Sequence, residues 1–385
     1  MELLPVEIVN EILLQVNKST LYQAAQVCKQ WRRLAVQQVV PIKVYDDFKM
    51  ACTIGDRLRI IKSKHNANWI RKSLYITCQM GHQDLVQLMI TQGANNWNGA
   101  LEGACRGGHL ELVQLMITQG ATDWYTCFYR ACEAGHKDVV HLMIIKGVQY
   151  WNGGLEGSCR GGHLDLVQLM ISKGANNWNI ALEAACQGGH ENVVQLMISQ
   201  GADDWNDGLI GACAGGHQAV AELMIIKGAN DWNTALNYAC RIGNQALVQL
   251  MMAKGADSWN LGLRSACEGG HQAIAQLMII QGANHWNSAL FSSCRGGHLQ
   301  LAEVMITQGA NNWNSALEAG CREGHEELVQ LMITKGANSW NKSLQAACKA
   351  GHVDLMQLMI TQGASACACR RSLALHTNII VNVKS

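Results

Sequence analysis

The sequence predicts an all-α protein in which a short N-terminal three-helix module precedes an α-solenoid of 27-residue helix pairs. Two regularities predict the solenoid. Tryptophan recurs every 27 residues from Trp97 to Trp340, and cysteine keeps the same step eleven times from Cys78 to Cys348. Glycine and methionine follow the same step, and histidine comes after that glycine in ten of eleven units. A period held in phase over so many units indicates stacked copies of one supersecondary unit.

Residues 97–123 show how one unit is built. Asn98 is expected to cap a first helix that runs to about Arg106, because its side chain can accept from the free amides of the first turn. The glycine pair that follows ends this helix, since glycine adopts the positive φ of a helix C-terminus. A second helix with a broad apolar face is expected over 110–119. Each pair has more apolar surface than it can bury alone, so neighbouring pairs must stack.

The core of this unit resembles the ankyrin motif. The family's Leu-His-x-Ala-Ala-x-x-Gly-His is matched by Leu101-Glu102-Gly103-Ala104-Cys105 and, two residues further on, by Gly108-His109. The resemblance covers roughly residues 46–366. Each unit lacks the stretch that forms a projecting β-hairpin finger in the family. We expect the tryptophan rings to stack between repeats where the bases of those fingers would pack.

The first forty residues predict a second, smaller module. Pro5 suits the first turn of a helix, where a missing amide hydrogen costs nothing. A later helix is expected from Leu21 to about Val40. Three short helices bury too little apolar surface to be stable by themselves. The apolar surface in excess of that small core indicates a partner.

Two stretches of this module resemble the F-box. The signatures are Leu4-Pro5-Val6-Glu7-Ile8 near the start and Val27-Cys28-Lys29-Gln30-Trp31-Arg32-Arg33-Leu34 near the end. The resemblance implies docking to Skp1, the adaptor that joins F-box proteins to a cullin-based ubiquitin ligase. By matching position, the residues that would form or support this interface are Leu4, Pro5, Ile8, Ile12, Leu13, Val27, Cys28 and Trp31. The alternative is that these helices only cap the N-terminal end of the solenoid.

The expected organisation has four parts. Residues 1–44 form the F-box-like module, residues 45–68 a degenerate capping repeat, and residues 69–366 eleven ankyrin-like repeats. Residues 367–385 match nothing in the repeat. They are expected to form a terminal cap, with a disordered or eroded remnant as the alternative.

Composition argues against several classes of partner. The chain has 30 Lys+Arg and 29 Asp+Glu, a formal net charge of +1, which gives no reason to expect a nucleic acid or a membrane surface. Its apolar runs fall far short of the ~20 residues that span a bilayer. The N-terminus is acidic where a secretory signal is basic. We therefore expect a reducing compartment, the cytoplasm, with the nucleus left open.

The cysteine and histidine ladders invite a metal-site interpretation, but the expected geometry argues against it. The glycine pair breaks the helix between Cys105 and His109. Stacked helices lie about 8–10 Å apart, whereas zinc needs ligands within about 2.0–2.3 Å and a disulfide tolerates ~4.4–6.8 Å between Cα atoms. We expect buried free thiols, a histidine that braces the turn, no cofactor, no metal and no enzymatic activity.

Target binding is expected where the units differ, on the solvent face of the first helices. Because binding hot spots favour Tyr, Trp and Arg, the predicted target-binding residues are Tyr125, Tyr129, Arg130, Tyr238, Arg241, Phe291 and Arg295. Each is alternatively a drifted surface residue. Three Glu→Arg pairs, 102–106, 156–160 and 318–322, are expected to form a solvated face.

The function expected from these features is that of a protein–protein adaptor, the substrate-recognition subunit of a Skp1–cullin–F-box ubiquitin ligase. The F-box-like module would dock a Skp1-like adaptor while the solenoid holds an unknown protein target. The alternative is an ankyrin scaffold without a ligase role. Finger-shortened repeats behind an F-box also resemble ankyrin proteins of large DNA viruses of amoebae, which would make the adaptor a host protein and the location the host cytoplasm.

Overall fold

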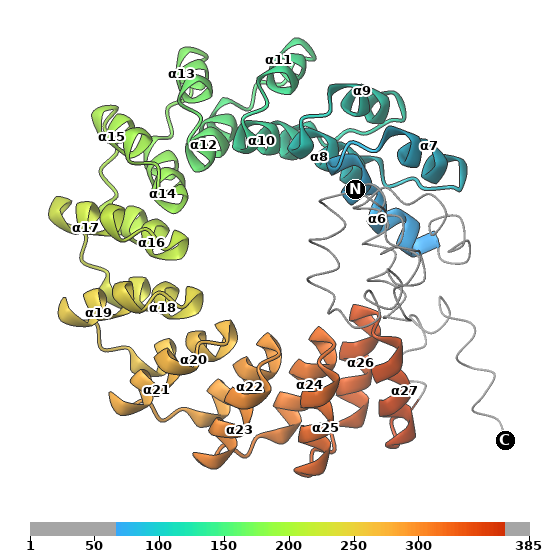
Figure 1. Ribbon diagram of the computed structural model, residues 1–385, viewed down its shortest axis with the longest axis vertical. Helices are drawn as coiled ribbons and strands as arrows, with labels where there is room; N and C mark the ends of the chain where they lie inside the picture. The colour runs from blue at the N-terminus through green and yellow to red at the C-terminus, as the bar shows by residue number, and fades with distance from the viewer. Residues whose placement is uncertain (1–66, 366–385) are drawn as a thin grey trace, which may run out of the picture. The chain divides into compact units, whose positions relative to one another are not determined.

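The computed structural model describes residues 67–365, and this part of the chain contains 22 α-helices and no β-strand (Figure 1). It falls into two compact units, which divide between Asn177 and Trp178. Each unit is described by itself. The predicted adaptor-binding residues from Leu4 to Trp31, the degenerate repeat up to residue 66 and the segment 367–385 lie outside the described residues.

The first unit contains four helix pairs. Their bounds are α6 Ala67–Gln79, α7 Gln83–Thr91, α8 Trp97–Gly107, α9 Leu110–Thr118, α10 Trp124–Ala134, α11 Lys137–Ile145, α12 Trp151–Gly161 and α13 Leu164–Ser172.

The second unit contains seven pairs. Their bounds are α14 Trp178–Gly188, α15 Glu191–Ser199, α16 Trp205–Gly215, α17 Gln218–Lys227, α18 Trp232–Ile242, α19 Gln245–Ala253, α20 Trp259–Gly269, α21 Gln272–Ile280, α22 Trp286–Gly296, α23 Leu299–Thr307, α24 Trp313–Glu323, α25 Glu326–Thr334, α26 Trp340–Ala350 and α27 Val353–Thr361.

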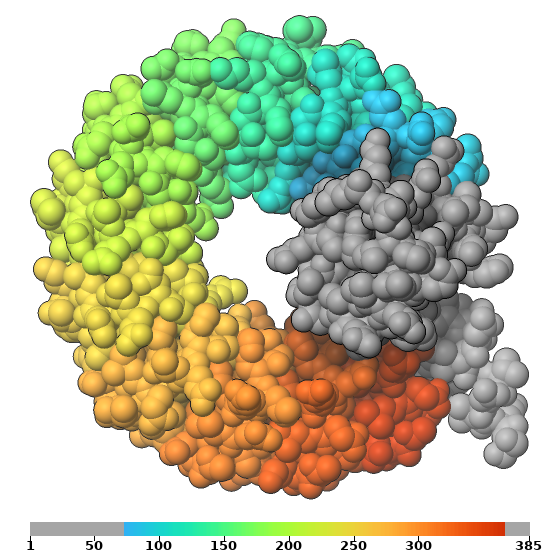
Figure 2. Space-filling view, in the orientation of Figure 1, coloured from blue at the N-terminus to red at the C-terminus, as the bar shows by residue number. Residues whose placement is uncertain are grey.

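Within each unit the helices form two rows. The first helices of successive repeats, which carry the even numbers, lie side by side, and each packs on the second helix of its own repeat (Figure 1). Neighbouring repeats of a unit are in contact in the space-filling view (Figure 2). The solenoid architecture expected from the 27-residue period is therefore present in both units.

The helix bounds follow from local chemistry. Helix α8 begins at Trp97, and its N-cap is Asn96, whose side chain accepts from the Gly99 amide at 3.3 Å. The expectation that Asn98 is the cap is therefore wrong, because Asn98 already lies inside the first turn. Gly108 ends the helix with a φ of 74°, a left-handed conformation that glycine adopts without strain. The expected core side chains of this helix, which include Leu101, have no exposed surface.

The tryptophan rings are half-buried in every repeat from Trp97 to Trp340. Among the described residues of either unit no ring contact joins two of these tryptophans, and the one ring contact that involves them is between Phe128 and Trp151, at 6.1 Å. The expected stacking is therefore wrong. Each tryptophan begins a first helix, so its neighbour is about one helix spacing of 8–10 Å away, beyond the ~4.5–7 Å of aromatic contact.

The cysteine ladder forms part of the core. Ten of its members, from Cys78 to Cys321, are free and buried, as is the additional Cys127. Cys348 is disulfide-bonded, so the expectation of a free thiol is wrong at the C-terminal end of the ladder. The spacing of stacked helices excludes a disulfide between ladder cysteines of adjacent repeats. Cys348 belongs to the last repeat, which has no following repeat at that spacing.

Candidate protein-binding surface

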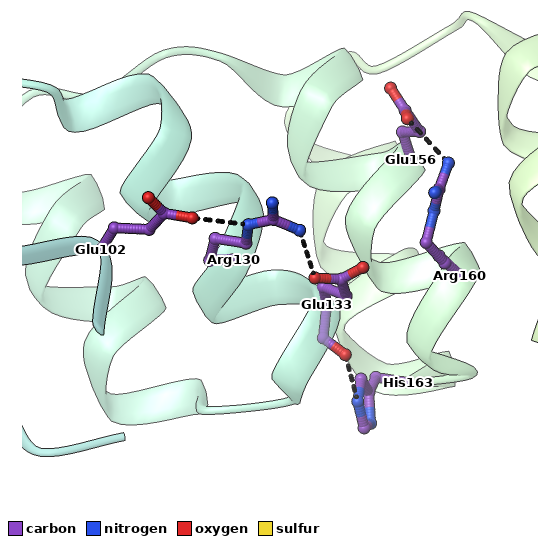
Figure 3. Close-up of polar contacts among 6 residues, drawn as sticks. All are labelled: Glu102, Arg130, Glu133, Glu156, Arg160 and His163. Carbon is purple, nitrogen blue, oxygen red and sulfur yellow. Dashed lines mark hydrogen bonds and ion pairs between the residues drawn. The ribbon is translucent and has the colours of Figure 1, made fainter. Parts of the chain in front are cut away.

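In seven of the described repeats, the histidine ties its repeat to the one before it. His163 Nε2 lies 3.1 Å from the carbonyl oxygen of Glu133, thirty residues earlier (Figure 3). The same bond at 3.0–3.2 Å joins His109, His136, His271, His298, His325 and His352 to carbonyls of the preceding first helix. Because a carbonyl only accepts, Nε2 is the protonated nitrogen. The expected brace exists, but it links two repeats rather than closing a turn.

An asparagine ladder braces the connecting loops. Asn98 Oδ1 accepts from the amides of Thr122 at 2.7 Å and Asp123 at 3.1 Å, in the loop that leads to the next repeat. Equivalent bonds are made by Asn152, Asn179, Asn206, Asn233, Asn260, Asn287, Asn314 and Asn341. From the sequence, Asn98 is interpreted as a helix cap, which misses its role in bracing the next loop. The fixed position of the asparagine directly after the tryptophan was the available signal that it has a structural role.

The seventh residue of each first helix, counted from its tryptophan, faces the preceding first helix. A Cβ added at Gly103 would lie 2.2 Å from the Tyr75 carbonyl oxygen, which shows how closely these helices approach. Small residues fill the equivalent positions, namely Gly157, Ala184, Gly211, Ser265, Ser292, Ala319 and Ala346. Arg130 and Tyr238 are the departures. In each unit they mark the most loosely packed pair of neighbouring first helices, α8–α10 and α16–α18.

Arg130 is held by two carboxylates in the first unit (Figure 3). Its Nε donates to Glu102 at 3.1 Å and its Nη1 to Glu133 at 2.9 Å. Burial alone would lower the pKa of the guanidinium, but the hydrogen bonds to Glu133 and Glu102 raise it. The guanidinium also lies 5.5 Å from the ring centroid of Tyr129. Much of the charge of Arg130 is therefore neutralised within the chain.

The three expected Glu→Arg pairs have different outcomes. Glu156 and Arg160 pair at 3.2 Å, and Glu318 and Arg322 at 2.8 Å. The pair 102–106 is wrong, because Glu102 accepts from Arg130 of the next repeat instead. Arg130, at the seventh position of α10, has a side chain long enough to reach Glu102 on α8.

Tyr125 and Tyr150 form an exposed aromatic pair. Tyr125 stands where nine other repeats carry the bracing asparagine, and Tyr150 stands where other repeats carry a capping residue. Their ring centroids are 5.3 Å apart in an edge-to-face arrangement, and the residues are 63% and 42% exposed. Phe128 lies beneath in the core, and burial raises the pKa of the half-buried Tyr129 to about 12.

Four predicted target-binding residues lie on two helices of the second unit, α18 and α22. Arg241 on α18 and Arg295 on α22 both contact Oε1 of Glu268, which lies on α20 between them, at 3.4 Å and 3.2 Å. Tyr238 and Phe291 are half-buried on the same helices as these arginines. Sequence reasoning missed Glu268, because an isolated glutamate at a variable position carries no signal of its own.

A cleft of about 440 Å³ adjoins this group at the N-terminal ends of α20 and α22. Its lining includes Trp259, Leu261, Arg264 and His285. Arg264 is exposed and precedes Glu268 by one helical turn. This arginine also went unrecognised in the sequence, since single charges occur throughout the array.

The described residues hold no recognisable reactive centre. No three metal-ligating side chains converge within residues 67–365. Burial raises the pKa of thiols such as Cys213 to about 12, so they stay protonated near neutral pH and are poor nucleophiles. Within the same range no helix is long and apolar enough to cross a membrane.

Comparisons with known proteins match two kinds of module. An F-box-like family model matches residues 1–40, and a model of ankyrin repeats in three copies matches residues 74–152 and 263–343. Both are protein-interaction modules, and neither is a catalytic domain. The fold-class prediction is confirmed: residues 67–365 form an all-α repeat solenoid, parts of which match ankyrin repeats, and residues 1–40 match an F-box-like model.

Two solved structures resemble parts of the fold. The human ASB11 ankyrin repeat domain is 20% identical, with 48% of this chain and 98% of that chain covered and a TM-score of 0.35. The pentatricopeptide repeat protein PPR10 from maize is 14% identical, with 96% and 70% covered and a TM-score of 0.30. A search of the curated proteins found no match.

Proposed function

We propose that this chain is the substrate-recognition subunit of a Skp1–cullin–F-box ubiquitin ligase. The observation that carries the proposal is an F-box-like match over residues 1–40 on the same chain as ankyrin repeats. In this assignment the F-box-like module binds a Skp1-like adaptor through Leu4, Pro5, Ile8, Ile12, Leu13, Val27, Cys28 and Trp31. Other subunits supply the chemistry of ubiquitin transfer.

The solenoid would hold the protein target. Its first helices carry the residues that vary between repeats. The core side chains are buried, and the bracing histidines and asparagines are hydrogen-bonded within the solenoid, so these residues serve the fold rather than a target. Of the proposed target-binding residues, Tyr125, Tyr129 and Arg130 lie in the first unit. Tyr238, Arg241, Phe291 and Arg295 lie in the second unit. The setting would be the cytoplasm, and a host cytoplasm with a host adaptor if the chain is viral.

The alternative function is an ankyrin scaffold without a ligase role. It is separated from the proposal by recovery of purified Skp1 on the immobilised full chain, compared with Leu4→Asp and Trp31→Ala. A charge or a truncation in a small apolar interface removes its main contacts, so recovery should fall by about tenfold or more. Arg322→Gln, a loss of charge on α24 of the solenoid, is the matched control and should leave recovery unchanged.

Two results would reject the ligase role. One is equal recovery of Skp1 on all four proteins, and the other is no recovery on the unaltered chain. Helix content by circular dichroism, measured on the same samples, shows whether the solenoid has remained folded in each variant.

A further inference from the structure

Two arginines from different first helices share one carboxylate on the helix between them. Arg241 and Arg295 each use Nη2 to reach the same Glu268 oxygen, at 3.4 Å and 3.2 Å. Glu268 is mostly buried, with its side chain 19% exposed, whereas the arginine side chains are 54% and 49% exposed. Arg264 adds a third exposed guanidinium one turn before Glu268. The group therefore carries two positive charges in excess.

Neighbouring carboxylates do not neutralise this excess. The sixth and tenth positions of α16 hold Ile210 and Ala214, which carry no charge. On the other side, Glu318 of α24 is paired with Arg322 at 2.8 Å. Asp257, the one carboxylate of the adjoining cleft, accepts from Asn233 Nδ2 at 3.1 Å but keeps its negative charge, and counting it still leaves the group one positive charge in excess.

The two paired guanidiniums retain free donors. A guanidinium has five N–H groups in a fixed fork that fits a carboxylate with two parallel bonds. Glu268 engages one nitrogen of Arg241 and one of Arg295, so most donors of each fork are left for another acceptor. The shared carboxylate also holds both arginines in place, which reduces the entropy that a ligand must overcome on binding.

Apolar side chains accompany the charges. Tyr238 lies about one turn before Arg241, and Phe291 lies one turn before Arg295. Both rings are half-buried, and Ile242 is exposed beside Arg241. The cleft lined by Arg264, Leu261 and Trp259 continues this surface toward the helix N-termini.

We propose that Tyr238, Arg241, Arg264, Glu268, Phe291 and Arg295, here called the arginine patch, bind an acidic target segment in which carboxylates are interspersed with aromatic or aliphatic side chains. Target carboxylates bind the free edges of the guanidiniums, and apolar side chains cover Tyr238 and Phe291. The proposal rests on the proposed function only in calling the occupant a ligase target.

A nucleic acid fits the patch less well. A phosphate backbone is bound by a long row of cations, whereas here a carboxylate lies between the guanidiniums of Arg241 and Arg295. The chain as a whole has a formal net charge of only +1. Half-buried rings between the arginines instead suit the apolar side chains of a peptide.

The test uses the full chain and short fluorescein-labelled peptides in a fluorescence anisotropy assay. One peptide combines glutamates with phenylalanine and leucine. A second replaces each glutamate by lysine, a third replaces each apolar residue by serine, and a single-stranded RNA serves as the fourth probe. We expect the acidic apolar peptide to bind about tenfold or more tightly than the other three, and to weaken as salt is raised.

Two variants test the arginines directly. Arg241→Gln with Arg295→Gln should reduce binding of the acidic apolar peptide by about tenfold or more. Adding Glu268→Gln removes the stranded carboxylate and should leave binding equally weak. Arg160→Gln is the matched control, since Arg160 of α12 occupies the same tenth position but pairs with Glu156 within its own helix. It should change the affinity by less than about twofold.

Three outcomes would overturn the proposal: equal binding of the acidic and basic peptides, unchanged affinity in the double variant, or RNA bound in preference to every peptide. Skp1 recovery on the same preparations keeps the two questions apart. If the chain recovers Skp1 but does not bind the acidic peptide, the proposed ligase role stands and only the proposed ligand of the arginine patch is rejected.

Discussion

At the scale of single residues, the histidine ladder shows how a repeat can join its neighbour with one side chain. The His163 ring lies against two glycines, because a Cβ built at Gly135 or Gly161 would come within 2.4 Å and 2.6 Å of it. Its Nε2 reaches the Glu133 carbonyl. The two glycines thus create the space that the ring needs, and the ring supplies a donor to a carbonyl near the end of a helix.

His163→Ala should therefore lower the free energy of unfolding by about 1–3 kcal/mol, because the Glu133 carbonyl loses its partner and the ring leaves a void. The chain itself provides the control. Asn244 takes the histidine's place in its repeat and donates from Nδ2 at 3.1 Å to the carbonyl of Gly216, which lies two residues after the equivalent of Glu133. An asparagine can thus still join two repeats, so His163→Asn should be less damaging than His163→Ala in urea unfolding. Equal midpoints for both variants would contradict a role for an inter-repeat hydrogen bond at this position.

The asparagine ladder marks a limit of sequence reasoning at this scale. An asparagine next to the start of a helix predicts a cap, because capping is a local interaction. Asn98 instead accepts from amides 24 and 25 residues further on. Local propensity cannot distinguish the two roles, since the loop that needs acceptors comes near only after the repeats have stacked.

At the scale of helices, the seventh position sets how closely first helices pack. Glycine at this position brings two backbones together, as at Gly103 and Gly211. The pairs α8–α10 and α16–α18, where Arg130 and Tyr238 take this position, have fewer close backbone approaches than the other first-helix pairs of their units, and at α8–α10 Arg130 reaches Glu102. Two of the predicted hot-spot residues, Arg130 and Tyr238, therefore stand at the position that is otherwise small.

Two glycine-to-alanine substitutions test this packing. In Gly211→Ala the new Cβ would lie 2.5 Å from the Glu183 carbonyl oxygen, so α14 and α16 must move apart. We expect a loss of about 1–3 kcal/mol in the free energy of unfolding. Gly320→Ala is the control, because its Cβ meets only a Val329 methyl at 3.1 Å and alanine is the better helix former. If both variants gained or lost stability alike, close helix approach would not depend on the seventh residue.

Helix positions were largely predictable from sequence, because tryptophan, paired glycines and apolar periodicity bound each helix. The expected N-cap at Asn98 differs from the observed N-cap, Asn96, by two residues. The closeness of neighbouring first helices was not predictable from the sequence. Arg130 stands at a position that is otherwise small, but only the structure shows that this position faces the backbone of the preceding helix.

At the scale of the whole chain, the candidate site is a departure from the repeat. Tyr238, Arg241, Phe291 and Arg295 stood out in the sequence because they are aromatic or cationic at variable positions. The meeting of Arg241 and Arg295 at Glu268 depends on side chains from three repeats. A one-dimensional pattern shows which residues vary, and stacking decides which of them meet.

The thiol ladder runs through both units and should make the stability of the whole chain sensitive to alkaline pH. Burial raises the pKa of Cys213 and Cys240 from 9.0 to about 12, and most of the other buried thiols are raised similarly. An unfolded thiol ionises near pH 9, whereas the folded thiol stays protonated. The folded state then binds more protons, so stability is fully present below about pH 9 and is lost as pH rises toward about 12.

Each such thiol should lower the free energy of unfolding by about 1.4 kcal/mol per pH unit within that window. Urea unfolding followed by circular dichroism from about pH 8 to about pH 11 measures the combined slope. Tyrosine and lysine ionisation also contribute there, so the decisive comparison is with Cys213→Ala plus Cys240→Ala. This variant should be less stable at neutral pH because the substitutions leave cavities. The slope of its free energy of unfolding against pH should be smaller by the contribution of two thiols. Parallel slopes for the two proteins would mean that the buried thiols do not control the alkaline limit of the fold.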